Sequence, residues 1–152
     1  MARPRAQSSI RGTATAELSL LLPFLLVAVL GTTDFARICF QTIAIANAAQ
    51  AGAKYATHSP SHATDSVGIQ TAVLNDLQDT AAAADVAVES ERYCTCPDGG
   101  SVSCVDGTCG GSAATRRTYV RVRVEKTFEA LFPYPGVPAS VQLVREARVR
   151  AR

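Results

Sequence analysis

The chain has 152 residues, a net charge of +2 at pH 7, 47% hydrophobic residues and no tryptophan. This length allows one domain, and the small net charge gives no general electrostatic case for nucleic acid or an anionic membrane surface as partner. Removing the three arginines of the first eleven residues would lower the net charge from +2 to −1, so the remainder is not basic either.

An apolar stretch that contains one acidic residue lies close to the N-terminus. Residues 18–33, LSLLLPFLLVAVLGTT, carry no charge, and counting from Thr13 gives 21 residues interrupted only by Glu17. A helix needs about 20 mostly apolar residues to cross a bilayer, so we predict one transmembrane helix. A carboxylate inside such a helix is costly unless it is neutral, interfacial or paired, which makes Glu17 the most informative residue in the chain.

A short basic leader, residues 1–12, precedes the apolar stretch. It contains three arginines and no acidic residue: Arg3, Arg5 and Arg11. Because positively charged flanks stay in the cytoplasm, we expect the leader there and everything after about Asp34 outside the cytoplasmic membrane.

The leader ends in a possible processing site. Cleavage after Gly12 would make Thr13 a new amino terminus, and its ammonium group would then be available to pair with Glu17 of a neighbouring subunit. A secretory signal peptide is the alternative interpretation. Its best cleavage site, near Gly31, is a poor match, and an acid within the apolar core is unusual for such a signal.

The helical pattern continues beyond Asp34 and Arg37, which mark the exit from the membrane. Apolar residues recur at helical spacing, so we predict one continuous helix over residues 13–57, about 65 Å long at 1.5 Å per residue. Small residues spaced four apart let helix backbones approach closely, and we expect this stripe to pack on the chain's own head, on other subunits or on both. The stripe consists of Ala44, Ala48, Gly52 and Ala56.

Two parts of this region together resemble a known family. One is the spacing from Arg11-Gly12 to Glu17 with the apolar run behind it, and the other is residues 45–56, IANAAQAGAKYA. Over residues 11–56 the chain resembles the TadE-like family, small pseudopilin-type proteins of the tight-adherence (Flp) pilus assembly machinery. The resemblance implies cleavage by a dedicated prepilin peptidase, membrane residence and a part in pilus biogenesis. One departure is Leu18, where processed Flp-type prepilins favour tyrosine.

A turn-rich connector, residues 57–66, follows the long helix. His58 and His62 are four residues apart, a spacing that suits a metal ion on a helix. Pro60 between them disfavours a regular helix, and no further ligand is fixed nearby. We therefore predict no metal site and no cofactor.

The remainder is predicted to form a second helix and three strands. The helix should begin after a cap at Asp65 or Ser66 and reach about residue 84. Period-two alternation then predicts half-buried strands at about 86–93, 119–125 and 141–150, most simply an antiparallel meander. The expected fold is α+β: a long N-terminal helix, then a small head with one helix packed on a three-stranded antiparallel sheet and a disulfide-rich loop. The apolar face of the second helix comprises Val67, Ile69, Val73, Leu74 and Leu77.

The predicted second and third strands are rich in arginine. A basic patch for an acidic partner is one interpretation. We favour a solvated face with Glu125, Glu129 and Glu146 as cross-strand partners, since basic stretches bind partners when their charge is unbalanced. The arginines are Arg121, Arg123, Arg145, Arg148, Arg150 and Arg152.

Four of the five cysteines lie in the loop of residues 94–109, which is rich in Gly, Ser and Asp. Their gaps fit poorly to the paired C-x₂-C knuckles of zinc sites, and oxidation is the default outside the cytoplasm, so we predict two disulfides. A Cys94–Cys96 bridge would be strained, which leaves 94–104 with 96–109, or 94–109 with 96–104. Cys39 remains unpaired, either as a buried small hydrophobe or in a bridge between subunits.

No catalytic arrangement is evident, because the sequence has no Gly-rich phosphate loop after a strand, no nucleophile with a placed base and no paired acids in a recognisable pocket. We therefore predict a structural protein, not an enzyme. The expected organisation is a cytoplasmic leader (1–12), a transmembrane and extended helix (13–57) and an extracytoplasmic head (58–152).

We expect this protein to join or prime a pilus assembly through its long helix, with Glu17 setting the register. The expected partners are the membrane, other pilins or pseudopilins, the pilus assembly machinery and a prepilin peptidase, and nucleic acid is not among them. The alternative is an uncleaved single-pass binding module whose disulfide loop holds an external ligand.

Overall fold

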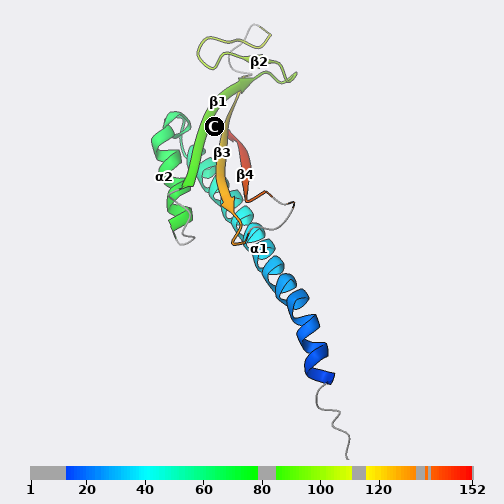
Figure 1. The fold of residues 1–152 in the computed structure, drawn as a ribbon. Coiled ribbons are helices and arrows are strands. Elements are labelled where there is room, and N and C mark those ends of the chain that lie inside the picture. The colour runs from blue at the N-terminus through cyan, green and yellow to red at the C-terminus, as the bar shows by residue number, and fades with distance from the viewer. Residues whose placement is uncertain (1–12, 79–84, 111–115, 133–135, 137, 152) are drawn as a thin grey trace, which may run out of the picture. The chain divides into compact units, whose positions relative to one another are not determined.

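The computed structural model of the chain describes residues 13–78, 85–110, 116–132, 136 and 138–151. Two helices and four strands follow one another, with a short 3₁₀ turn between the helices (Figure 1). The chain divides into two compact units, whose boundary lies between Arg37 and Ile38. The elements are α1 (Thr13–Ala56), η2 (His62–Thr64), α2 (Ser66–Leu77), β1 (Val86–Thr95), β2 (Ser101–Val102), β3 (Arg117–Glu129) and β4 (Ser140–Ala151).

The first unit contains the apolar part of α1. This helix has 44 residues, ends within one residue of the predicted position, and contains a stretch long and apolar enough to cross a membrane. Its side chains from 15 to 29 are exposed. The hydroxyls bond within the helix: Ser19 donates to the carbonyl of Ala16 and Thr33 to that of Val29, each at 2.8 Å. These hydroxyls therefore need no water, as lipid surroundings require.

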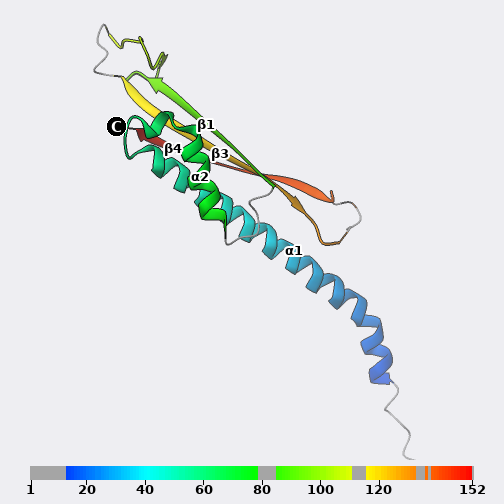
Figure 2. The ribbon, with the colours of Figure 1, turned by 90° about the vertical axis from the view of Figure 1, so that its left-hand side faces the viewer.

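The second unit, residues 38–152, contains a small core between the helices and one face of the sheet. Both helices lie on the same side of the sheet and leave its other face open (Figure 2). Alternation places Val120, Val122 and Val124 of β3 fully in the core, with polar side chains on the open face, as the period-two pattern predicted. The helices contribute Ile45, Ala48, Ala49, Ala53, Ala56, Ile69, Val73 and Leu77.

The sheet is antiparallel with strand order β2-β1-β3-β4. Its three long strands form the predicted meander, which confirms the α+β class. The count of three strands was wrong, because β2 pairs with the end of β1 through Cys94 and Thr95. Two residues inside a Gly- and Ser-rich loop are too few to show an alternating pattern, so this strand left no signal in the sequence.

α2 begins where the sequence predicted, but one apolar residue that was expected on its buried face is exposed. Asp65 caps it by accepting a hydrogen bond from the backbone N–H of Gly68 at 2.9 Å. The buried face consists of Ile69, Val73 and Leu77, spaced four apart. Val67 was expected on this face but is 70% exposed, because two residues of helix turn it by about 200° away from Ile69. The helix ends at Leu77, and the predicted continuation over 79–84 lies outside the described residues.

Candidate functional site

The predicted processing site lies at the start of α1, and only its second residue is among the described residues. Gly12 lies outside the described residues, and Thr13 is the first residue of the helix. Glu17 follows one turn later with an exposed side chain. Within the part of the chain that the structure describes, no side chain bonds to its carboxylate. The first unit therefore presents a carboxylate on the surface of an apolar helix.

The small-residue stripe of α1 faces the core of the chain's own second unit. Ala48 and Ala56 are fully buried, Gly52 is buried and Ala44 is half-buried. A Cβ at position 52 would lie 2.6 Å from Cγ2 of Val73 in α2, so only glycine permits this approach of the two helices. The stripe thus sets the distance between α1 and the rest of the unit.

The opposite face of α1 is open. Phe40 is 63% exposed and Ile43 is 60% exposed, and Asn47 and Gln50 continue this face toward the end of the helix. Cys39 is also exposed, which corrects the expectation of a buried small hydrophobe. The rest of the second unit packs on the side of α1 that carries the buried alanines. Cys39 lies on a different side of the helix and is therefore outside the core. This face is available to another molecule.

A hydrogen-bonded junction joins the end of α1 to the start of α2. The Tyr55 hydroxyl donates to Oδ2 of Asp65 at 2.8 Å, while Oδ1 of the same carboxylate accepts from Gly68. These bonds lower the pKa of Asp65 below its ordinary value, the backbone N–H of Gly68 contributing most and Tyr55 next. A Cβ on Gly68 would lie 2.6 Å from Cζ of Tyr55, so this glycine too is required by close approach.

The two histidines of the connector lie beside this junction. His62 meets the Tyr55 ring edge-on at 4.6 Å between ring centroids, and the His58 ring lies 6.2 Å from that of His62. Ser59 bonds to Nδ1 of His62 and also accepts from its backbone N–H at 3.2 Å, which orders the turn before η2. The described residues contain no group of three or more His, Cys, Asp or Glu that could hold a metal ion.

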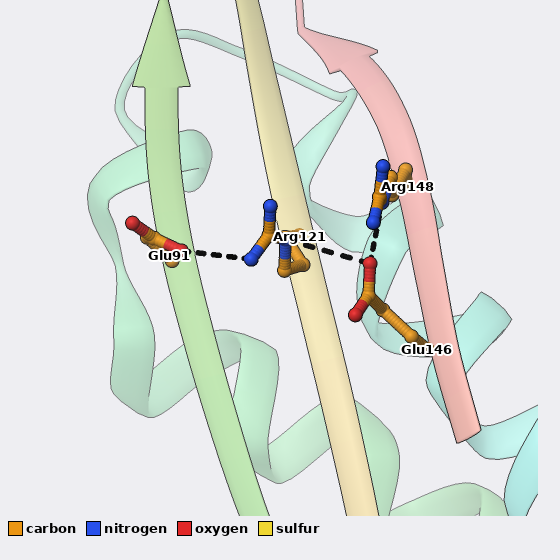
Figure 3. A network of polar contacts seen from close by, with 4 residues as sticks. All are labelled: Glu91, Arg121, Glu146 and Arg148. Carbon is orange, nitrogen blue, oxygen red and sulfur yellow. Dashed lines mark hydrogen bonds and ion pairs between the residues drawn. The ribbon is translucent and has the colours of Figure 1, made fainter. Parts of the chain in front are cut away.

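Ion pairs cross the open face of the sheet (Figure 3). Arg121 on β3 reaches Glu91 on β1 at 3.5 Å and Glu146 on β4 at 3.4 Å, and Arg148 also pairs with Glu146. The bond from Arg148, followed by the positive charges of Arg121 and Arg123, holds the pKa of Glu146 below its ordinary value. Several of the arginines are therefore balanced, as expected for a solvated face.

The strand register explains which acids take part. Glu91, Arg121 and Arg148 stand in one cross-strand row, and Glu146 lies in the next row. Glu146 was predicted as a partner, whereas Glu91 was missed because its row depends on a register that sequence alone does not show. Two tyrosines, Tyr93 and Tyr119, stack in the adjoining row at 5.5 Å, and Arg121 lies 5.4 Å over the Tyr93 ring.

Two disulfides tie the loop beyond β1, confirming that bridges are present in the head. Of the two arrangements left open, the structure has Cys94–Cys104 and Cys96–Cys109, with Cα–Cα distances of 5.2 and 5.5 Å. The side chain of Arg116 also holds this loop, through hydrogen bonds. Its Nη1 donates to the carbonyls of three loop residues: Ser103 at 3.5 Å, Val105 at 3.4 Å and Gly107 at 3.2 Å.

Comparisons with curated proteins and with solved structures give no match. A comparison with family models gives a match that falls on α1. Residues 12–54 match the model of the TadE-like protein family, which confirms the resemblance. Together with a helix able to cross a membrane, this match supports a membrane protein associated with the Tad pilus.

Proposed function

We propose that this chain is a TadE-like pseudopilin, a single-pass structural component of Tad/Flp pilus biogenesis that assembles through α1. The observation that carries the proposal is a coincidence of boundaries. The family match covers residues 12–54, and α1 covers Thr13–Ala56. The match with the family therefore lies almost entirely on the long helix, in the range that also contains Gly12 and Glu17.

The proposed assembly mechanism begins at the membrane. A prepilin peptidase cleaves after Gly12, and the new amino group of Thr13 pairs with Glu17 of a neighbouring subunit. A buried polar pair of this kind fixes register, because any other alignment leaves a charge unpaired in an apolar environment. The exposed carboxylate of Glu17 on an otherwise apolar surface agrees with this role.

The outer half of α1 is proposed to have two working faces. Its small-residue stripe holds the chain's own second unit at close distance, as the Gly52 and Val73 contact illustrates. Its open face, with Phe40 and Ile43, contacts other pilins or pseudopilins, because these large apolar side chains are exposed on the side of the helix that the second unit leaves uncovered. The role is structural and requires no catalysis.

The proposed orientation places the leader, residues 1–12, in the cytoplasm and the head, residues 58–152, outside it. The three arginines of the leader are expected on the cytoplasmic side, because positively charged residues that flank a membrane helix stay on that side. The disulfides Cys94–Cys104 and Cys96–Cys109 agree with this placement, since such bridges persist in oxidising compartments.

The first test is the intact mass of the membrane-extracted protein, expressed with and without a prepilin peptidase, with Gly12→Leu as control. We expect loss of residues 1–12 only when the peptidase is present and only with Gly12 intact. An uncut chain would contradict the proposal and leave a plain signal anchor, the form required by an anchored binding module. A cut after about Gly31 would indicate a secreted domain.

The second test addresses the register. Glu17→Ala should leave membrane insertion intact and impair assembly. Ser19→Ala is the matched control, because its hydroxyl bonds only within the helix, to the Ala16 carbonyl. Normal piliation by the Glu17 variant would disprove the pairing with Thr13.

A further inference from the structure

The end of β3 and the start of β4, with the residues 130–132 and 138–139 next to them, lie at one end of the second unit. Within this unit α1 and β4 run in the same direction, because residues 57–60, just after α1, line the same surface pocket as Arg150 near the end of β4. The start of β4 therefore lies at the end where α1 enters the unit at Ile38 (Figure 2). The turn is closed by a bond from the Ala130 N–H to the Ala139 carbonyl at 3.0 Å.

Exposed apolar side chains gather at this end. Of the seven large hydrophobic residues that are exposed among the described residues of the second unit, three belong to the turn and its flanks. Leu131 is 54% exposed, Phe132 42% and Val141 39%. Phe40, at 63%, lies in the first turn of α1 within the unit. Single exposed hydrophobics are ordinary, but a group of them marks an interaction surface.

The same stretch is uncharged. Residues 130–144 contain no Asp, Glu, Lys, Arg or His. The loop at the opposite end of the sheet contrasts with it, because it carries Asp98, Asp106, Arg116 and Arg117. Apart from Glu129, which is exposed at the end of β3 opposite Ser140, this stretch therefore suits an environment of low polarity, and the opposite loop suits water.

Chain length brings the apolar end close to the bilayer. Only four residues separate Thr33, the last of the uncharged run, from Ile38, and even a fully extended chain covers these five steps in at most about 18 Å. The hydrocarbon core of a bilayer is about 30 Å thick within a total of about 40–45 Å, which leaves roughly 5–8 Å of headgroup layer on each side. The Ile38 end of the unit is thus tethered within reach of that layer.

We infer that the described residues flanking the β3–β4 turn contact the bilayer surface from which α1 emerges, with Leu131, Phe132 and Val141 in the lipid interface. The inference rests on the membrane-spanning role of α1 in the proposed function. The short segment between Thr33 and Ile38 keeps the lipid surface within reach of this end of the unit. A second copy of the chain would instead have to be attracted from a distance, and residues 130–144 carry no charge that could attract it. The head then lies against the membrane until the subunit is taken into an assembly.

Tryptophan fluorescence tests this placement, because the chain has no tryptophan of its own. Phe132→Trp, Val105→Trp and Phe24→Trp each supply a single fluorophore: in the turn, in the cysteine loop and within the apolar helix. The full-length variants are reconstituted in phosphatidylcholine vesicles, with and without brominated acyl chains, and with iodide on both sides of the membrane. Val105 is the matched control, since its side chain is 82% exposed at the other end of the sheet.

Relative to Val105→Trp, we expect Phe132→Trp to show blue-shifted emission, quenching by bromines near the headgroups and a severalfold smaller iodide quenching constant. Phe24→Trp should be quenched by deep bromines. Unchanged circular dichroism and one free thiol per chain establish that each variant is folded.

Three results would overturn the inference. Iodide quenching of Phe132→Trp equal to that of Val105→Trp, with Phe24→Trp still quenched by deep bromines, defeats the lipid contact alone. Absence of bromine quenching at position 24 removes the membrane helix on which the proposed function also depends. Protection of position 132 from both quenchers, lost on dilution of the protein in lipid, assigns this surface to a second copy of the chain.

Discussion

Gly52 of α1 and Val73 of α2 approach so closely that a Cβ on the glycine would lie 2.6 Å from the valine Cγ2. Gly52→Ala should therefore destabilise the second unit although alanine is the better helix former. Overpacking costs about 1–3 kcal/mol, and the gain in helix propensity offsets at most about 1 kcal/mol. We expect the free energy of unfolding, followed by circular dichroism in detergent, to fall by about 1–2 kcal/mol.

Two variants check the cause of that loss. Gly31 is also helical, and nothing lies within 4 Å of a Cβ added there, so Gly31→Ala should cause no loss of stability and, by helix propensity, a small gain. In a Val73→Ala background, Gly52→Ala should cost much less than it does alone, because the clashing methyl group is gone. Equal effects at positions 52 and 31 would contradict the steric explanation.

Asp65 should make the stability of the second unit depend on pH in the acidic range. Its pKa is lowered by the bonds from Gly68 and Tyr55, so the folded state binds the proton more weakly than the unfolded chain does. The stabilisation is complete above the unfolded pKa of about 3.9 and is lost as pH falls through the lower folded pKa. The denaturation midpoint should therefore decline as the pH falls below about 4, and less steeply in Asp65→Asn. Asp76→Asn, on the exposed face of α2, is the control, and an unchanged profile in Asp65→Asn would refute the assignment.

The two disulfides should differ in their contribution to stability. They join cysteines 10 and 13 residues apart, so chain entropy alone gives each about 3 kcal/mol. Replacing Cys94 and Cys104 by serine should cost slightly more than replacing Cys96 and Cys109, because the buried member of the first bridge, Cys94, is 1% exposed and that of the second, Cys109, is 7% exposed, while Cys96 and Cys104 are both half-buried. Denaturant titration of the two double variants measures the difference, and equal losses would show that burial at Cys94 does not matter.

Arg116 should keep the cysteine loop closed independently of the bridges. Arg116→Ala removes the donor shared by the carbonyls of Ser103, Val105 and Gly107. We expect faster amide hydrogen exchange over residues 103–110, with exchange in β3 unchanged. The neighbouring Arg117→Ala is the control because that side chain is exposed. Protection that survives in Arg116→Ala would mean that the bridges alone order this loop.

The sequence predicted the elements that repeat a pattern over many residues. The long helix was found from its apolar run and its spaced alanines, and the three long strands from alternation as clear as that of Val120, Val122 and Val124 in β3. The excess of cysteines in a polar loop predicted bridges, and the residue before α2 predicted its cap. Each of these signals is local, so it needs no knowledge of how the chain packs.

Features that depend on packing were not predicted. The bond from Tyr55 to Asp65 joins residues ten apart across a turn, and the pairing of Glu91 with Arg121 depends on the strand register. The choice between the two disulfide arrangements depends on where the loop folds back, and β2 forms only because it does. Exposure of Cys39 likewise follows from which side of α1 the sheet covers.

The interleaved bridges of the cysteine loop have a consequence for the protein's resistance to proteolysis. Every peptide bond between Cys94 and Cys109 lies inside at least one of the rings closed by Cys94–Cys104 and Cys96–Cys109. A single proteolytic nick in this loop therefore leaves the two fragments covalently joined. The damaged protein would migrate as one band on a gel run without reductant and as two with it, and β3 and β4 would remain attached to α1.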